Sequence, residues 1–487
     1  MSSSAALGGT ALKSYSQVFV GGRWVEPGGT GRLEVVSPST EEVLATVPEI
    51  TESDVDAAVS AARAAFDHGP WPRMTPAERG EALARVGREV AARYDDMVAA
   101  FTAEIGAPLA VSRAFHHNAL QMWDDVSTLH TRFGFEEDRD WNGGRGKLVH
   151  EPVGVVASVI PWNGPVATAS LKIGPALAAG CTVVLKPAPE GPLSTLLLAE
   201  ALEAAGLPEG VISVLPAGRE AGEHLVTHPG VDKVAFTGST AAGRRIMSLC
   251  GERVTRVSLE LGGKSAGIIA DDIPVQQVLP SLLPAGVGHS GQVCAALTRI
   301  LVPRARQQEL LDAMVPALEG MAIGDPTDDG TALGPLAAER QRDRVEDYIR
   351  IGRAEGARLV TGGGRPPGLD KGFYVQPTVF ADVRNDMRIA REEIFGPVLC
   401  VLPFDDIDEA VDIANDSDYG LSGAVYAADG ELAESVARRV RTGQISINGW
   451  EMCVVQPFGG FKQSGIGREG NDEGLRAYLE PKLIQYA

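Results

Sequence analysis

The chain has 487 residues, of which 44% are hydrophobic and 22% are charged, and its formal net charge is −20. A chain of this length is too long for one compact core, so we expect two large domains and a smaller appendage. Because so acidic a surface repels phosphate backbones and anionic lipids, the charge argues against nucleic-acid and membrane-surface binding.

The N-terminal part of the chain predicts strands followed by helices. Apolar residues and turn signals favour short strands over 18–25 and 33–47. A first helix is predicted by apolar residues at positions 55, 59, 62 and 66. A second helix begins with Thr75-Pro76-Ala77-Glu78, which has the pattern of a capping box.

From residue 151 onward, apolar runs alternate with helical segments, and we expect Ser194 to cap one of these helices. The runs are 153–160, 182–186, 211–215, 233–238 and 256–261. This alternation predicts an α/β fold with a doubly wound parallel sheet, which binds ligands at the carboxyl ends of its strands. Residues 262–460 alternate in the same way and predict a second α/β domain.

The cysteines and the start of the chain indicate a compartment. Five cysteines occur at wide spacing with no C-x-x-C pair, which argues against a disulfide framework and a structural zinc site. Residues 1–10 lack the basic and apolar regions of a secretory signal, and no run reaches the roughly 18 apolar residues of a membrane span. We therefore expect a cytoplasmic protein that holds no metal.

Three residues at strand ends or in loops could carry chemistry. Cys294 follows Gly291 in a polar loop, where helix dipoles or cations would produce a thiolate, although a lone cysteine is more often a small buried hydrophobe. Glu260 ends an apolar run and is either a general base with a raised pKa or a salt-bridged structural residue. Asn163 follows the first run and is either an oxyanion donor or a turn residue.

One glycine-rich pattern does not support a binding site. Gly465–Gly470 fits G-x-G-x-x-G, but no apolar strand precedes it, so we assign no dinucleotide site there.

Taken together, seven ordered motifs resemble those of the aldehyde dehydrogenase superfamily, which is NAD(P)-dependent, in its hydrolytic form. The motifs are Ile160-Pro161-Trp162-Asn163, Val184-Leu185-Lys186-Pro187, Phe236-Thr237-Gly238-Ser239, Glu260-Leu261-Gly262-Gly263-Lys264, Gly291-Gln292-Val293-Cys294, Glu392-Glu393-Ile394-Phe395-Gly396-Pro397 and Pro457-Phe458-Gly459-Gly460. They cover nearly the whole chain, and the ordered set is far more specific than any one motif.

The resemblance implies catalytic roles for four residues. Cys294 would attack the aldehyde carbon, and the resulting oxyanion would be held by the Asn163 side chain and the Cys294 backbone N–H. Glu260 would activate the water that hydrolyses the thioester. Lys172 matches a family lysine near that glutamate and is a candidate for a proton relay.

The resemblance also implies NAD as the cofactor, with NADP possible. Lys186 would contact the adenosine ribose, Ser239 the pyrophosphate and Glu393 the nicotinamide ribose. The further residues expected around the cofactor are Ile160, Trp162, Glu190, Gly218, Gly222, Gly238, Leu261 and Phe395. The family often has a ribose-binding glutamate at the position of Pro189, and Glu190 follows one residue later, so we expect NAD to be preferred.

The family fold implies three parts: a doubly wound cofactor domain, an α/β catalytic domain and a small β oligomerisation arm. We assign the cofactor domain to 1–133 and 151–261, and the catalytic domain to 262–460. The arm and the C-terminal segment take 134–150 and 461–487. The expected partners are a small-molecule aldehyde and further copies of the chain, in a homodimer or homotetramer.

Some positions depart from the family pattern. Gly164, Thr168, Leu171 and Ala295 are small or moderate where larger side chains are frequent, which predicts room for a bulky aromatic or terpenoid aldehyde. His289 stands where asparagine is common, and the sequence offers no reason for it. The alternative functions are a CoA-acylating semialdehyde dehydrogenase, which commonly lacks the glutamate matching Glu260, and a non-catalytic crystallin-like protein.

Overall fold

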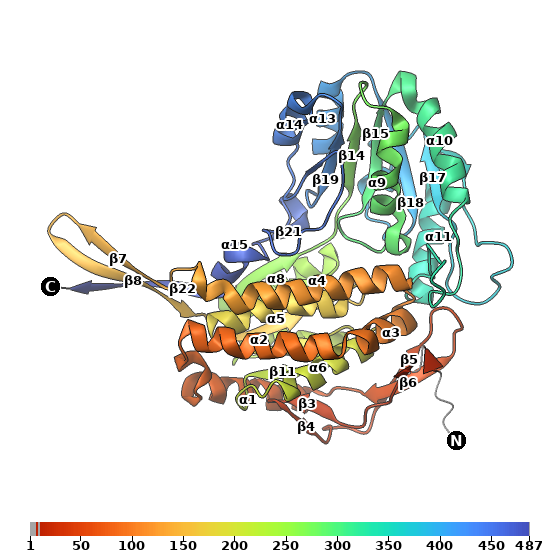
Figure 1. The fold of residues 1–487 in the computed structure, drawn as a ribbon. Helices are drawn as coiled ribbons and strands as arrows, with labels where there is room; N and C mark the ends of the chain where they lie inside the picture. Colours follow the sequence, from red (N-terminus) through yellow and green to blue (C-terminus); the bar gives the residue numbers. More distant parts are fainter. Residues whose placement is uncertain (1–5, 8–9, 487) are drawn as a thin grey trace.

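The computed structural model describes residues 6–7 and 10–486, so most of the segment 1–10 discussed above lies outside the described residues. Two α/β lobes are joined side by side, and a long hairpin projects from one of them (Figure 1). In the described part of the chain no helix is both long and apolar enough to cross a membrane.

The first lobe contains an eight-stranded sheet, and the five apolar runs form its parallel centre. In spatial order the strands are β21 (Gly465–Ile466), β13 (Arg256–Glu260), β12 (Lys233–Thr237), β9 (Val155–Val159), β10 (Thr182–Lys186), β11 (Ile212–Val214), β3 (Val18–Val20) and β4 (Arg23–Val25). Antiparallel strands complete both edges, and β21 at one edge comes from the segment that we grouped with the arm.

Helices cover both faces of this sheet, as a doubly wound fold requires. One face packs on α1 (Glu52–His68), α7 (Arg219–Thr227) and α8 (Thr240–Arg253). The other packs on α2 (Pro76–Ala92), α4 (Leu109–Thr128), α5 (Pro165–Ala179) and α6 (Leu193–Ala204), with α3 (Tyr94–Ile105) beside α4 and α6. Neighbouring strand residues such as Val155 and Val156 belong to opposite cores, because side chains alternate along a strand.

Two helix starts were predicted, and one prediction was wrong. The capping box of Thr75 and Glu78 is present at α2. Ser194 does not cap its helix, because α6 already begins at Leu193. Glu104 of α3 serves that end instead, and its carboxylate accepts hydrogen bonds from the N–H of Leu193 (2.6 Å) and of Ser194 (3.0 Å). Burial raises the pKa of Glu104 to about 7.

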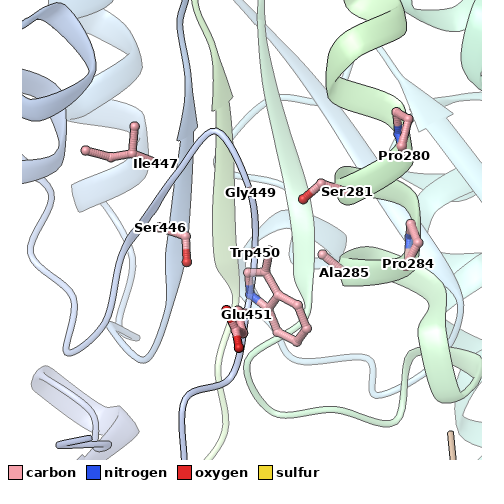
Figure 2. Close-up of a pocket in the computed structure, with 9 residues that line it drawn as sticks. All are labelled: Pro280, Ser281, Pro284, Ala285, Ser446, Ile447, Gly449, Trp450 and Glu451. Atoms are coloured by element: carbon pink, nitrogen blue, oxygen red, sulfur yellow. The ribbon is translucent and has the colours of Figure 1, made fainter. Parts of the chain in front are cut away.

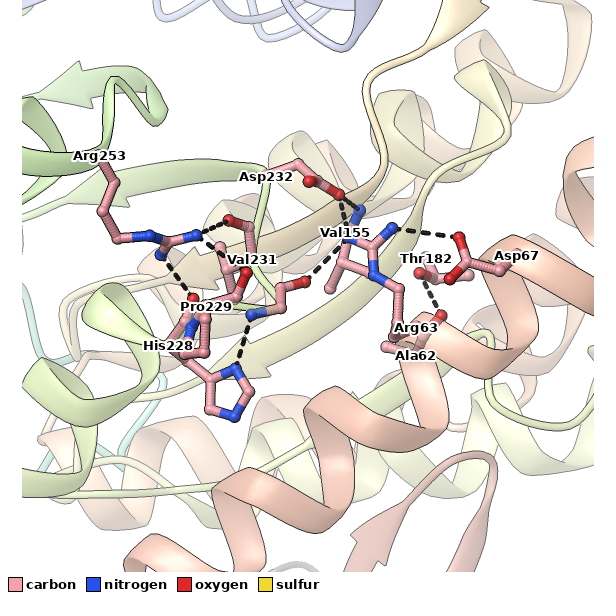
Figure 3. A network of polar contacts seen from close by, with 11 residues as sticks. Ala62, Arg63, Asp67, Val155, Thr182, His228, Pro229, Val231, Asp232 and Arg253 are labelled. Atoms are coloured by element: carbon pink, nitrogen blue, oxygen red, sulfur yellow. Dashed lines mark hydrogen bonds and ion pairs between the residues drawn. The ribbon is translucent and has the colours of Figure 1, made fainter.

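A polar network anchors the amino ends of the central strands to α1 (Figure 3). The Asp232 carboxylate accepts from the N–H of Val155 at 2.8 Å and pairs with Arg63 of α1. Arg253 of α8 donates to the carbonyls of His228 (2.7 Å) and Pro229 (2.9 Å). These bonds fix the amino ends of the strands, at the opposite end of the sheet from the carboxyl ends, where ligands are expected to bind.

The second lobe contains a seven-stranded sheet, again with helices on both faces. Its order is β16 (Arg358–Thr361), β17 (Thr378–Ala381), β18 (Val398–Phe404), β15 (Leu297–Pro303), β14 (Ser265–Ile269), β19 (Gly423–Tyr426) and β20 (Ser446–Ile447). The helices are α9 (Val275–Val287) and α10 (Gln307–Glu319) on one face, and α11 (Glu339–Ala354), α12 (Arg388–Arg391), α13 (Ile407–Asn415) and α14 (Gly430–Arg439) on the other.

The remaining strands form small separate sheets. The projecting hairpin consists of β7 (Glu136–Trp141) and β8 (Gly144–Pro152), and β22 (Leu479–Tyr486) pairs with β8 along its whole length (Figure 1). Two further pairs are β1 (Ala6–Leu7) with β2 (Thr10–Ala11) and β5 (Arg32–Val36) with β6 (Val43–Pro48). The short helix α15 (Asn471–Arg476) packs against α5.

Candidate active site

A cavity of about 530 Å³ lies between the two lobes, and the three residues singled out for chemistry all line it. Asn163 comes from the carboxyl end of β9, Glu260 from the carboxyl end of β13, and Cys294 from the loop before β15. Helices α4, α5 and α9 and the 450–458 segment supply most of the remaining wall. Carboxyl ends of parallel strands thus meet the nucleophile loop, as the doubly wound topology predicts.

The loop that carries Cys294 has an unusual backbone. His289 and Ser290 both have φ of 53°, and Gly291 has φ of 73°. A Cβ on Gly291 would lie 2.1 Å from the carbonyl oxygen of Gly396, so only glycine fits there. This close approach packs the loop against the motif that contains Glu393.

Asn163 is held close to this loop by a hydrogen bond. Its Nδ2 donates to the carbonyl oxygen of Gln292 at 2.8 Å, two residues before Cys294. The buried Gln292 side chain is fixed in turn, because its Oε1 accepts from the N–H of Ala337 at 2.9 Å. The Asn163 amide and the Cys294 thiol therefore line the same cavity, with the amide fixed to the backbone of the loop that carries the thiol.

The electrostatics of Cys294 differ from our expectation. We expected nearby dipoles or cations to favour the thiolate, but burial and the charges of Glu260 and Glu393 raise the pKa of this thiol to about 12. The protein alone therefore holds Cys294 as a thiol near neutral pH. Forming the nucleophile requires a base that takes the proton.

Glu260 has the properties of such a base. It is 4% exposed, and neither carboxylate oxygen accepts a hydrogen bond of normal geometry from a described residue. Burial, together with the charge of Glu469, raises its pKa well above the usual range. The backbone makes room for the carboxylate, because a Cβ on Gly459 would lie 2.7 Å from Glu260 Oε1.

A buried ion pair stands behind Glu260. Lys172 of α5 is completely buried and pairs with Glu469, which is 4% exposed and also lines the cavity. The sequence pointed to Lys172, but Glu469 escaped notice inside the glycine-rich pattern that we set aside. The only sequence signal for Glu469 was a carboxylate between Gly467 and Gly470, shortly before a helix.

The residues expected to hold a dinucleotide gather at the carboxyl ends of the central strands of the first sheet; this end of the sheet is called the carboxyl edge below. Ser239 caps the 14-residue helix α8, whose free N–H groups can bind a phosphate. Gly218 has open space around it. The Nζ of the buried Lys186 donates to the carbonyl of Ala217 at 2.6 Å, and Gly222 packs against the Lys186 side chain.

The other expected cofactor residues surround the carboxyl edge. Glu393 accepts from the N–H of Gly263 at 3.0 Å, and the rings of Trp162 and Phe395 meet edge to face at 5.6 Å. Glu190 forms an ion pair with Arg340 of α11. The positions fixed by backbone hydrogen bonds at the carboxyl edge are Ile160, Gly238 and Leu261. The open space at Gly218, the N-terminus of α8 and the polar side chains of Lys186 and Glu393 fit a dinucleotide.

Only some of the small residues that predicted a roomy pocket leave open space in the cavity. Thr168 and Leu171 line the cavity, but Ala295 is fully buried outside its wall, so that part of the expectation was wrong. The space at Gly164 is partly filled from α4, because a Cβ there would lie 2.6 Å from the ring of Phe115.

The structure gives a reason for His289. Its ring packs against Phe101 and Phe115 at 5.7 and 5.8 Å and interacts with the backbone of Asn163. Burial lowers the pKa of His289 to about 4, so the ring is neutral at physiological pH. A neutral imidazole therefore supports the segment after β9 that carries Asn163.

A thiol, a buried carboxylate and an amide line one cavity, and the N-terminus of α8 beyond it can bind a phosphate. This set of groups suits an oxidoreductase with a nucleotide cofactor. The family model described as "Aldehyde dehydrogenase family" matches residues 24–484, and the chain belongs to this family. It is an NAD-dependent oxidoreductase that acts on aldehydes.

Similar proteins cover almost the whole chain. Geranial dehydrogenase of Castellaniella defragrans is 45% identical, over 96% of this chain and 98% of that protein. A 3-succinoylsemialdehyde-pyridine dehydrogenase of a Pseudomonas species is 42% identical, over 97% and 99%. The crystal structure of a Mycobacterium tuberculosis aldehyde dehydrogenase complexed with NAD+ has a TM-score of 0.96 and 43% identity, over 98% and 99%. A Pseudomonas syringae aldehyde dehydrogenase complexed with NAD+ and octanal has a TM-score of 0.93 and 41% identity, over 96% of each chain.

Proposed function

We propose that this enzyme oxidises bulky hydrophobic aldehydes to carboxylic acids through a thioester on Cys294. The observation that carries the proposal is that Cys294, Glu260 and Asn163 line one largely apolar cavity. The cavity of about 530 Å³ is large enough for a terpenoid or aromatic aldehyde. A relative at 45% identity is named for geranial, a branched ten-carbon aldehyde, which supports this substrate class.

The first half of the reaction forms the thioester. The Cys294 thiol loses its proton to a base, the thiolate adds to the aldehyde carbon, and the new oxyanion accepts hydrogen bonds from Asn163 Nδ2 and the Cys294 N–H. NAD+ supplies the hydride acceptor when it is bound, with Lys186, Ser239 and Glu393 among the residues that hold it. Loss of hydride from the carbon leaves the acyl group on sulfur.

The second half releases the acid. Glu260 takes a proton from water, the hydroxide adds to the thioester carbon, and the C–S bond breaks to return the thiol. Burial raises the pKa of this base, and the ion pair behind it acts in both directions, because the charge of Glu469 raises that pKa and the charge of Lys172 lowers it. Glu260 also separates this function from the CoA-acylating alternative, in which a water-activating base would destroy the thioester.

Replacing Glu260 by glutamine separates the two halves. The amide cannot take a proton from water, so thioester hydrolysis should slow by about 10²–10⁴-fold. If Glu260 serves only hydrolysis, rapid mixing should show a burst of up to one NADH per site. Mass spectrometry should then find the acyl group on the peptide that contains Cys294. A slow burst that higher pH restores would mean that Glu260 also deprotonates the thiol, whereas wild-type turnover would contradict its role as base.

We also infer that NAD is preferred to NADP. A carboxylate near the ribose repels a 2′-phosphate, and Glu190 follows β10 on the cofactor side of the sheet. Arg340 partly neutralises Glu190, so the preference rests on an ion pair rather than a free carboxylate. Equal kcat/KM with both cofactors would contradict it.

We propose that the arm joins copies of the chain into a homodimer or homotetramer. The domain division is the one given above, except that β21 belongs to the sheet of the first lobe. On β22, Leu483, Ile484 and Tyr486 are 48%, 39% and 45% exposed, and β20 is an open edge of the second sheet. Exposed apolar strand edges invite pairing with another copy. Sedimentation of a variant that lacks residues 479–487 should show a smaller assembly. The five free cysteines favour a reducing, cytoplasmic location.

A further inference from the structure

We propose that Glu451 selects the charge of the substrate: it disfavours aldehydes whose far end is anionic and accepts neutral or cationic ones. This inference rests on the proposed function, because it concerns the same cavity. It identifies a specificity-determining residue at the cavity mouth, on the side away from the reacting thiol.

The first observation is the charge of the cavity wall. Three residues of the lining carry a carboxylate, namely Glu260, Glu469 and Glu451, and none of the lining residues is lysine or arginine. Glu469 is neutralised by its ion pair with Lys172, and Glu260 lies deep in the site with a raised pKa. Only Glu451 is exposed, so it is the ionised group that an entering substrate meets.

The second observation is a groove that adjoins the cavity and shares part of its wall. It has a volume of about 630 Å³, and Pro284, Ala285, Trp450 and Glu451 line both spaces. Figure 2 shows Glu451 next to the Trp450 indole, and both residues line the two spaces. The remainder of the groove presents two serine hydroxyls and apolar groups, again with no lysine or arginine. A substrate tail that leaves the cavity therefore passes a carboxylate in either space without meeting a cation.

The physical consequence depends on the tail. A carboxylate at the far end would lose part of its hydration beside Glu451, with no counter-ion in the wall to compensate it. A quaternary ammonium group would be attracted by the same carboxylate and could stack on the Trp450 ring. An alkyl tail would be little affected by the charge.

Three aldehydes with an eight-carbon chain test this inference: octanal, 8-oxooctanoate and 8-(trimethylammonio)octanal. Their aldehyde groups are equally reactive, because the charges are remote. The measurement is kcat/KM with NAD+ for the wild type, Glu451→Gln and Glu451→Lys. Glu42→Gln is the matched control, since it changes net charge equally from an exposed site outside the cavity.

In Glu451→Gln, the ratio of kcat/KM for 8-oxooctanoate to that for octanal should rise about 5-fold. That is the effect of two unit charges roughly 8 Å apart at an effective dielectric constant of about 40. Glu451→Lys should raise it roughly 25-fold and lower the ratio for the ammonium substrate. Added salt should raise the wild-type ratio and leave that of Glu451→Gln nearly constant.

An unchanged ratio in Glu451→Gln, or an equal rise in Glu42→Gln, would overturn the inference. In either case, octanal turnover in the same preparations shows that the protein is folded and that the proposed function stands. Failure to oxidise octanal or any bulkier aldehyde would instead contradict the proposed function itself.

Discussion

Replacing Lys172 by methionine should destabilise the enzyme and move its pH dependence. Lys172 is 0% exposed and Glu469 is 4% exposed, so removal of the ammonium group leaves a carboxylate buried without a partner. The loss of one partner from a buried pair costs about 3–5 kcal/mol. The double variant Lys172→Met, Glu469→Gln has no charge left to strand, so it should recover about 2 kcal/mol of that loss.

The same substitution acts on the general base. The charge of Lys172 lowers the pKa of Glu260, and the charge of Glu469 raises it. Because Glu260 must be deprotonated to activate water, Lys172→Met should shift the acidic limb of thioester hydrolysis to higher pH. Glu469→Gln should shift that limb to lower pH.

Urea denaturation and the pH dependence of single-turnover hydrolysis measure the two effects. The reasoning would be refuted by a Lys172→Met protein with the urea midpoint of the wild type, or by limbs that move in the same direction in both single variants. If Lys172→Met does not fold, the acid shift of Glu469→Gln still tests the electrostatic part.

Three further outcomes follow from the site. Because the pKa of Cys294 is about 12, its alkylation by iodoacetamide without cofactor should keep accelerating from about pH 7 to pH 10; a plateau near pH 8 would contradict this. Gly291→Ala should lower the Tm and reduce kcat by at least about 10²-fold, because its Cβ would meet the Gly396 carbonyl; a normal Tm and kcat would show that the loop can relax. Phe115→Ala should open the space above Gly164 and raise kcat/KM for branched over linear aldehydes by about 4-fold for each added methylene that it buries. No change in that ratio would place Phe115 outside the substrate path.

Local sequence signals predicted the elements that depend on neighbouring residues. The five central strands are continuous apolar runs because both faces of the sheet are buried, and the capping box of α2 lies within four residues. Ser194 misled us because a hydroxyl near a predicted helix start suggested a cap. The residue that accepts hydrogen bonds from the first N–H groups of α6 is Glu104, which lies 90 residues earlier in the chain than Ser194. No short stretch of the sequence contains both Glu104 and Ser194, so local signals could not predict their contact.

In the candidate site, too, features set by neighbouring residues could be predicted, and contacts between distant residues could not. Cys294, Glu260 and Asn163 could be predicted because each stands at a strand end or in a polar loop with a recognisable motif. Glu469 could not, because its meaning comes from Lys172, which lies 297 residues away. The thiol pKa also depends on carboxylates that only the fold brings near. Likewise, Gly164 suggested empty space that a ring from α4 partly fills.

The place of β21 in the first sheet has a consequence for synthesis of the protein. Residues 465 and 466 pair with β13, and Glu469 follows them to meet Lys172. A ribosome that has reached residue 460 has already made Cys294 and Glu260, but not the strand that borders β13 or the carboxylate that pairs with Lys172. The surroundings of Glu260 are therefore completed only by residues made after position 460.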